Sequence, residues 1–196
     1  MKTSIIMIVV SLLIVSAFLG ACSPAGAENA AGSQVETQAD TEGASVQQEE
    51  PADTGYGAKG ALADDAYTLE VMLTYALQDE YLARYEYELI MDKYGEITPF
   101  VNIKEAEEKH ISELLPLFEK YGIEVPEDES AEYAVMPESL LEAGETGVQA
   151  EIDNIAMYEA FLKQDIPEDV GEVFEALKKA SENHLQAFER LVRRES

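Results

Sequence analysis

The stretch EAEEKHISELL, residues 105–115, contains one of the two histidines in the chain. Glu107 and His110 are three residues apart, and the apolar side chains around them recur every three to four residues, as on one face of an α-helix. A helix here would carry Glu107 and His110 together on its apolar face. The second histidine, His184, lies in ASENHLQAF, residues 180–188, which has the same helical spacing.

The apolar periodicity continues on both sides of this stretch and predicts four helices with little sign of strands. They are expected at about residues 65–94, 102–121, 147–164 and 167–193. The signals for their ends are the ADD run before the first helix, Gly95, a capping box from Asn102 to Glu105, Gly122, and Pro167 at the start of the last helix. Pro116 lies inside the second helix and is expected to kink or interrupt it.

The connections between these helices indicate their topology. Short links join the first helix to the second and the third to the fourth, whereas residues 122–146 separate the second from the third. A further short helix is expected at 137–142 in this long connection. The prediction is an all-α four-helix bundle made of two antiparallel helix hairpins joined by a long crossover. An up-and-down bundle with one long loop is the alternative.

Each expected helix carries an ionisable side chain on its apolar face. These inward residues are Glu80, Glu107, His110, Glu151 and His184. A buried, unpaired carboxylate is costly, and no Lys or Arg falls on the same faces. A bound cation would offset the charge, and a set of carboxylates and imidazoles suits iron, manganese or zinc. The sequence therefore predicts a metal site inside the bundle. Local hydrogen bonding of each group by itself is the alternative.

The overall charge excludes one class of partner. The chain has 40 acidic and 13 basic residues, a formal net charge of −27. Binding to the phosphate backbone of nucleic acid requires clustered Lys and Arg, so nucleic acid is not expected as a partner. The sequence also has no Ser-His-Asp pattern, no second cysteine and no Gly-rich phosphate loop, so hydrolase and nucleotide chemistry have no support.

The amino terminus predicts export. Lys2 precedes the apolar run IIMIVVSLLIVSAFLGAC, residues 5–22, which has the layout of a secretory signal. LGAC at its end resembles a lipobox, the site where a prokaryotic lipoprotein is lipidated on cysteine. We therefore expect a signal peptide at 1–21, a disordered tether at 22–61 beginning at lipidated Cys22, and the helical domain at 62–196. A plain signal peptide or an N-terminal membrane helix is the alternative.

Four stretches together resemble the ferritin-like superfamily, which includes the rubrerythrins. They also resemble, more closely, an uncharacterised ferritin-like family of prokaryotic proteins that are often secreted or lipid-anchored. The stretches are LQDEYLARYEY, EAEEKHISELL, QAEIDNIAMYEAF and ASENHLQAF. The resemblance implies that Glu80 and Glu151 are single carboxylate ligands, that Glu107 and His110 form one Glu-x-x-His motif, and that His184 is the histidine of a second.

The chain departs from the superfamily pattern at Ser181, where a glutamate three residues before His184 is expected. Glu182 is about 100° away around the helix and is not expected to replace it. An asymmetric pair of ions or a single ion is then expected in place of a symmetric di-iron centre. Tyr87 and Tyr158 also lie on the inner faces, as packing residues or as hydrogen-bond donors to the ligands.

These features together predict a lipid-anchored metalloprotein on the outer face of a prokaryotic membrane that binds iron or manganese in the bundle core. The resemblance implies redox chemistry on dioxygen or peroxide. The alternative is a non-enzymatic surface binding or scaffold lipoprotein that keeps a relic or single-metal site. The expected partners are metal ions, dioxygen or peroxide, the membrane through the lipid anchor, and a second copy of the chain in a homodimer.

Overall fold

The computed structural model describes residues 55–196, which contain six helices and no strand. The helices are α1 (Gly57–Ala63), α2 (Leu69–Tyr94), α3 (Phe100–Tyr121), α4 (Ser130–Tyr133), α5 (Leu140–Phe161) and α6 (Glu168–Glu195). The all-helical expectation is confirmed, but the count of four is wrong because α1 and α4 are additional short helices. No helix in the described part of the chain is long and apolar enough to cross a membrane.

The expected signal peptide and Cys22 lie outside the described residues, as does most of the expected tether. The end of that tether is different from the expectation, since residues 57–61 form most of α1. Ala61 is fully buried and α1 packs against α2 and α5. Residues 57–61 therefore belong to the helical domain.

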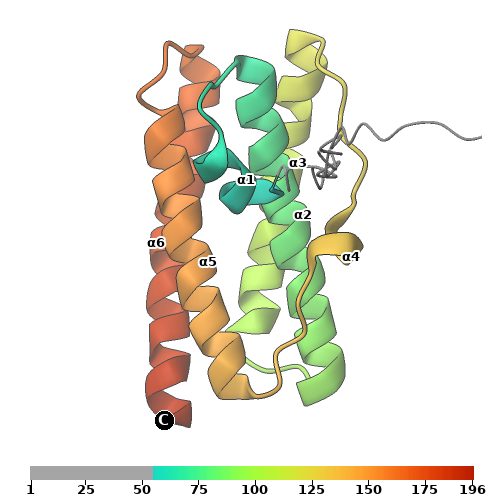
Figure 1. Ribbon diagram of the computed structural model, residues 1–196, viewed down its shortest axis with the longest axis vertical. Helices are drawn as coiled ribbons and strands as arrows, with labels where there is room; N and C mark the ends of the chain where they lie inside the picture. The colour runs from blue at the N-terminus through green and yellow to red at the C-terminus, as the bar shows by residue number, and fades with distance from the viewer. Residues whose placement is uncertain (1–54) are drawn as a thin grey trace, which may run out of the picture. The chain divides into compact units, whose positions relative to one another are not determined.

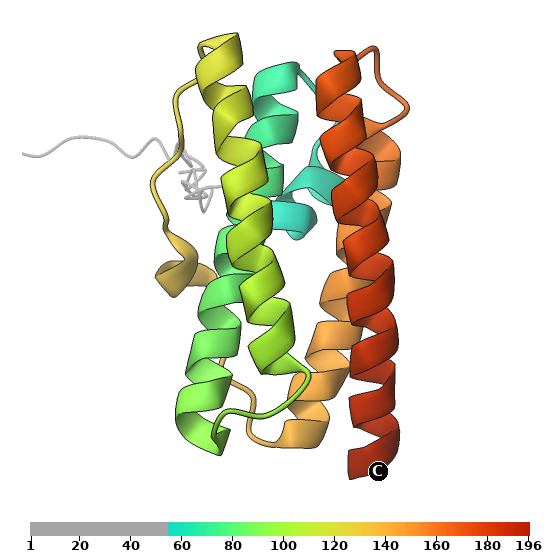
Figure 2. The same cartoon turned by 180° about the vertical axis from the view of Figure 1, so that it is seen from behind.

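The four long helices are arranged as two antiparallel hairpins that lie side by side (Figures 1 and 2). One hairpin consists of α2 and α3, the other of α5 and α6, and contacts also join α2 to α5 and α3 to α6. The connection from α3 to α5 runs along the outside of α2 and includes α4. Lys93 and Tyr94 donate hydrogen bonds to the carbonyl oxygen of Pro137, which fixes the end of this connection on α2.

Polar caps set two helix starts that differ from the expected ones. Thr68 accepts a hydrogen bond from the N–H of Val71, so α2 begins at Leu69 and not at residue 65. Ser139 accepts from the N–H of Glu142, so α5 begins at Leu140. The short helix expected at 137–142 and the helix expected from 147 are therefore one continuous helix.

Helix α3 differs from the expectation at its start and in its middle. It begins at Phe100 after Pro99, so Asn102 lies inside it and does not act as a cap. It continues past Pro116 to Tyr121 without interruption. Gly122 then ends the helix with a left-handed backbone (φ 66°), a conformation that glycine adopts without steric cost.

The apolar core consists of two clusters. The first, here called the Phe174 cluster, includes Leu73, Leu77, Leu114, Phe118, Phe161 and Phe174. The second, the Phe188 cluster, consists of Tyr87, Ile90, Phe100, Ile103, Ala143, Phe188 and Leu191. On every long helix, the inward ionisable residue falls between members of the two clusters. The core is therefore divided by a layer of polar side chains.

Helices α5 and α6 approach closely because α5 has glycine at two buried positions. A Cβ atom at Gly147 would lie 2.7 Å from the ring of Phe188, and one at Gly144 would lie 3.0 Å from Val192. Phe188 is fully buried among Tyr87 and Phe100, so its ring has little freedom to move. The small residue at 147 thus sets the distance between the two helices next to the polar layer.

We expect Gly147→Ala to lower the free energy of unfolding. Alanine favours a helix interior by about 1 kcal/mol over glycine, but overpacking a core costs about 1–3 kcal/mol, and the overlap with Phe188 should dominate. Gly171→Ala is the matched control, because the nearest atom to its added Cβ is 3.7 Å away. Urea unfolding should show a less stable Gly147 variant and a more stable Gly171 variant. Stabilisation by both would contradict the close approach.

Candidate functional site

The five inward residues predicted from the sequence come together in the polar layer. Glu80 is contributed by α2, Glu107 and His110 by α3, Glu151 by α5 and His184 by α6. The three carboxylates and His110 are at most 7% exposed, and His184 is slightly more open. Their oxygen and nitrogen atoms form two groups of three within 4.8 Å, and both groups contain Glu107.

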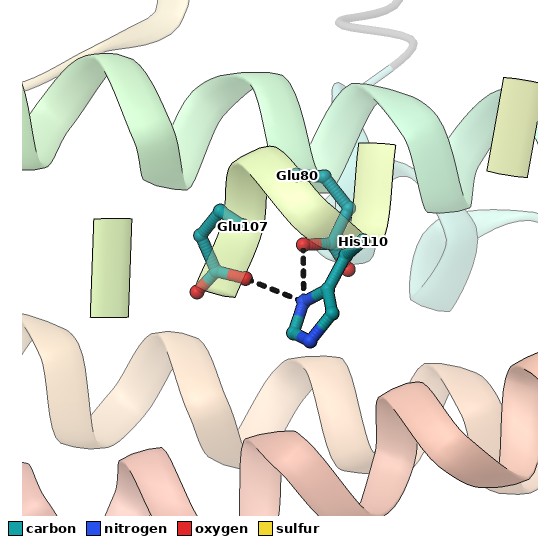
Figure 3. A group of neighbouring side chains, drawn as sticks. All are labelled: Glu80, Glu107 and His110. Atoms are coloured by element: carbon teal, nitrogen blue, oxygen red, sulfur yellow. Dashed lines mark hydrogen bonds and ion pairs between the residues drawn. The ribbon is translucent and has the colours of Figure 1, made fainter. Parts of the chain in front are cut away.

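The first group surrounds His110. Its Nδ1 atom lies 2.7 Å from Oε2 of Glu107 and 3.1 Å from Oε2 of Glu80. Figure 3 shows the two carboxylates approaching the same ring nitrogen from α2 and α3. The three-residue spacing of Glu107 and His110 accounts for their contact, whereas Glu80 is placed there by the packing of α2 on α3.

The second group surrounds His184. Its Nδ1 atom lies 3.3 Å from Oε1 of Glu107 and 3.4 Å from Oε1 of Glu151. Glu107 therefore contacts one histidine through each of its two oxygens and links the two hairpins. The two imidazole rings lie nearly parallel, with centroids 5.8 Å apart. Each group thus offers two carboxylates and one imidazole, with one carboxylate shared.

The charges in this layer are compensated in part by the histidines. No Lys or Arg of the described residues forms an ion pair with Glu80, Glu107 or Glu151. Burial lowers the pKa of His110, but hydrogen bonds to Glu107 and Glu80 outweigh it and raise the pKa to about 10. The pKa of His184 is raised to about 9, since hydrogen bonds to Glu107 and Glu151 outweigh its burial.

The three carboxylates respond differently to the same surroundings. Burial raises the pKa of Glu107, but hydrogen bonds from both histidines overcome this effect and lower it to about 2. Burial raises the pKa of Glu151 to about 7 and that of Glu80 well above its ordinary value. In the absence of a metal ion, two imidazolium groups and a proton on Glu80 would keep the layer close to neutral. The charge of these carboxylates can therefore be compensated either by a cation or by protonation within the layer. The sequence analysis considered the cation but not the protonated histidines.

The two inward tyrosines have different roles. The hydroxyl of Tyr158 donates to Oε1 of Glu80 at 3.1 Å and so helps to orient that carboxylate. Tyr87 packs between Phe100 and Phe188 in the apolar cluster. Of the two roles expected for these residues, Tyr158 takes the hydrogen-bonding role and Tyr87 the packing role.

Ser181 occupies the position on α6 that corresponds to Glu107 on α3, three residues before a histidine. It is buried, and its hydroxyl donates to Oδ1 of Asn154 at 2.7 Å. The amide of Asn154 in turn donates to Asp79 on α2. Glu182 is exposed and takes no part, as expected. A hydroxyl that is hydrogen-bonded through Asn154 to Asp79 thus stands where a further carboxylate was expected.

Asp79 and Asn154 were not identified from the sequence. Ile152, an apolar residue next to Glu151 that helical periodicity places near the inner face, is 45% exposed, while Asn154 is buried. A signal was present, because Asn154 follows Glu151 by three residues, the spacing of Glu107 and His110. Asp79 had no such signal, because it is the direct neighbour of Glu80 in the sequence. In the structure its side chain is partly exposed.

A small cavity of about 20 Å³ adjoins the site between α2 and α5. Its lining includes all three carboxylates of the site, together with Ser181 and Asn154. A cavity of this size holds about one water molecule or ion. The site therefore combines two overlapping sets of potential ligands with a polar cavity that is large enough for one water molecule or one ion.

These features define an all-helical protein with a buried cluster of carboxylates and histidines between two helix hairpins. Residues 70–196 match the family described as "Uncharacterized protein domain (DUF2202)". The match spans more than half of the chain, so the chain belongs to this family. The expected membership of an uncharacterised family is thereby confirmed.

The chain is also similar to a protein from an archaeon. It is 29% identical over 130 residues to "Uncharacterized protein MJ0754" of Methanocaldococcus jannaschii, covering 59% of this chain and 70% of that protein. The crystal structure of hypothetical protein MJ0754 from Methanococcus jannaschii superposes with a TM-score of 0.58 and 26% identity. That alignment covers 67% of this chain and 84% of the other, so the two chains have similar helical folds.

We expect Asn154→Leu to destabilise the protein although it preserves the branched shape and the number of heavy atoms of the side chain. The substitution removes the acceptor Oδ1 from the Ser181 hydroxyl and one donor from Asp79, and each lost hydrogen bond costs about 0.5–1.5 kcal/mol. Asn183→Leu is the control, because Asn183 is exposed and its amide only donates to the carbonyl oxygen of Lys179. Thermal unfolding should show a clearly lower Tm for the first variant alone. Equal melting temperatures would mean that the hydrogen-bond chain does not contribute to stability.

Proposed function

We propose that this protein is a ferritin-like four-helix-bundle metalloprotein that binds iron or manganese in its polar layer. The order of the long helices supports the ferritin-like assignment, because two antiparallel hairpins are joined by one long crossover along the outside. The short helices α1 and α4 would be additions to that bundle. The observation that carries the metal assignment is the pair of overlapping ligand groups that share Glu107.

The residues present fit a divalent cation. Glu80 and His110 would hold one ion, Glu151 and His184 a second, and Glu107 would be common to both. Carboxylate and imidazole ligands suit iron and manganese, and zinc also binds such sets. The cavity of about 20 Å³ beside the three carboxylates leaves room for a non-protein ligand. Tyr158 would hold Glu80 in position through its hydrogen bond.

Bound iron or manganese would supply redox chemistry with dioxygen or peroxide, the activity that the resemblance implies. The contribution of the protein would be a water-poor layer between the Phe174 and Phe188 clusters, which keeps the ligands apart from solvent. Ser181 offers a hydroxyl where a charged ligand was expected, so the ligand set carries three carboxylates and two imidazoles. This favours an asymmetric or single-ion centre.

A non-enzymatic role as a binding or scaffold lipoprotein is the second candidate function. Its support is the hydrogen bonding of the layer itself, in which both histidines contact carboxylates and Ser181 is engaged by Asn154. A site that is neutral and hydrogen-bonded without a cation is compatible with a relic. The two functions differ in one observable property, the presence of a bound metal that reacts with peroxide or dioxygen.

The metal site predicts a specific response to one substitution. Glu107→Gln keeps the size of the side chain but removes the charge shared by both ligand groups, so it should abolish stoichiometric metal binding. His184→Ala should remove at most the second ion and leave the group around His110. Elemental analysis of untagged protein by plasma mass spectrometry measures both effects.

Glu108→Gln is the matched control for Glu107→Gln, because Glu108 is the exposed neighbour on the same helix. It should leave the metal content unchanged. Wild-type protein without bound metal after reconstitution with iron(II) or manganese(II) would refute the metal site and leave the scaffold role. Metal that binds without reacting with peroxide or dioxygen would support the relic.

We also propose that the protein is exported and held on the outer face of a prokaryotic membrane by a lipid on Cys22. The support is the apolar run at 5–22 and its LGAC ending, with the only cysteine of the chain at the end of that run. Two acyl signals are needed for stable membrane anchoring, as lipoproteins provide.

Expression in a bacterial host should yield a mature chain that begins at Cys22 and carries a lipid. Intact-mass spectrometry of the membrane fraction measures the cleavage position and the added mass together. Cys22→Ser should remove the lipid and also prevent the cleavage before residue 22, so the chain should keep its apolar run and lack the added mass. A wild-type chain that starts elsewhere and carries no lipid would contradict the anchor without affecting the metal site.

A further inference from the structure

The buried site has one hollow side. Along the helix axes it is covered by the Phe174 and Phe188 clusters. Between α2 and α5, in contrast, the cavity of about 20 Å³ lies directly beside Glu80, Glu107 and Glu151. This is the side on which a particle of the size of one water molecule fits next to the carboxylates.

A larger groove lies on the same side of the molecule. It has a volume of about 470 Å³ and is lined by residues of α1, α2, α4 and α5, by Gly55 and Tyr56 before α1, and by Val135. Figure 1 shows α1 lying across α2 and α5 in this region. The groove and the small cavity share two lining residues, Asp79 and Ala150. These two residues therefore form the boundary between the groove and the buried site.

The groove carries negative charge toward the site. Its lining contains three carboxylates, Asp79, Glu86 and Asp153, and one basic residue, Lys59. Glu86 and Asp153 lie in the outer lining, whereas Asp79 borders the cavity. An excess of one sign of charge on a concave surface raises the local concentration of counter-ions and their association rate. The groove is thus suited to a cation and not to an anion.

One wall of the groove is formed by α1, which precedes the residues matched by the family. Asp79 holds this wall, because it accepts a hydrogen bond from the N–H of Ala58 at 2.8 Å. The same carboxylate accepts from Asn154, which contacts Ser181. Asp79 therefore joins the wall of the groove to the polar layer.

We propose that the groove is the access route through which a divalent cation reaches the buried site, passing between Asp79 and Ala150. This inference rests on the proposed metal binding and adds a path to it. The slightly open His184 is the other place where the polar layer approaches solvent. The groove is favoured because it combines a neighbouring cavity with carboxylates that continue to the ligands.

Ala150→Leu tests the route by adding bulk at the boundary. Binding of cobalt(II), followed by stopped-flow visible absorption, should become slower by about tenfold. The dissociation rate should fall by the same factor and leave Kd unchanged, because an obstacle on a path does not alter its end states. Thr146→Leu is the control, since Thr146 lines the groove but not the cavity, and it should change the rate by less than twofold.

The charge of the groove is tested by the double variant Glu86→Gln and Asp153→Asn, which keeps the hydrogen-bond acceptors of both side chains. The association rate should fall by about threefold at low salt, and the difference should vanish at high salt. Asp165→Asn with Glu172→Gln removes two exposed carboxylates elsewhere and should have no such effect.

The outcomes separate the route from the metal site. Unchanged rates in Ala150→Leu and in the Glu86 and Asp153 variant, with normal cobalt content, would overturn the groove as the route and indicate access beside His184. A lower cobalt content in Ala150→Leu at equilibrium, in a variant with a normal circular dichroism spectrum, would also overturn it. Wild-type protein that binds no cobalt would overturn both proposals.

Discussion

The contact of Glu107 with both histidines is the interaction on which the arrangement of the polar layer depends. One oxygen of this carboxylate lies 2.7 Å from Nδ1 of His110 and the other 3.3 Å from Nδ1 of His184. Because His110 is on α3 and His184 on α6, this single side chain connects the two hairpins inside the core. A shift of one hairpin along the other would separate Glu107 from a histidine and leave a buried charge unpaired, which is costly. This electrostatic cost favours the observed alignment of the two hairpins.

The polar layer has a structural consequence for the rest of the core. It separates the Phe174 cluster from the Phe188 cluster, and each of the four long helices crosses all three regions in order. A helix shifted by one turn would place an ionisable group among apolar side chains. The carboxylates and histidines thus contribute to specifying the alignment of the helices, in addition to any role as ligands. Close packing at Gly147 and Phe188 adds a steric constraint next to the layer.

The two halves of the layer are similar but not equivalent. In the α2–α3 hairpin a glutamate precedes the histidine by three residues, whereas the α5–α6 hairpin has Ser181 at that position. Its hydroxyl donates to Asn154, and the amide of Asn154 donates to Asp79, so a hydrogen-bond network extends from the layer to α1. The cavity and the groove both lie on this side. The loss of one carboxylate therefore coincides with the more open part of the site.

Local sequence was sufficient to predict the helical class, the ends of helices at Gly95 and Gly122, and the inward direction of Glu80, Glu107, His110, Glu151 and His184. These properties follow from periodicity and from short-range backbone preferences, which act within a few residues. It predicted the start of α6 at Pro167, but it was not sufficient for the starts of α2 and α5, for α1 and α4, or for the inward position of Asn154. Short helices are stabilised by packing on their neighbours, and a sequence pattern does not report that packing.

Only the tertiary structure decided which inward groups form hydrogen bonds with one another. Glu107 and His110 meet because they share a helix face, but Glu80, Glu151 and His184 reach them from three other helices. The hydrogen bonds that raise the pKa values of both histidines exist only after the hairpins pack together. Likewise, the chain from Ser181 to Asp79 joins residues that are distant in sequence. The sequence determined which groups face inward, and the packing of four helices determined which groups meet, because contacts between helices depend on distances that local preferences do not set.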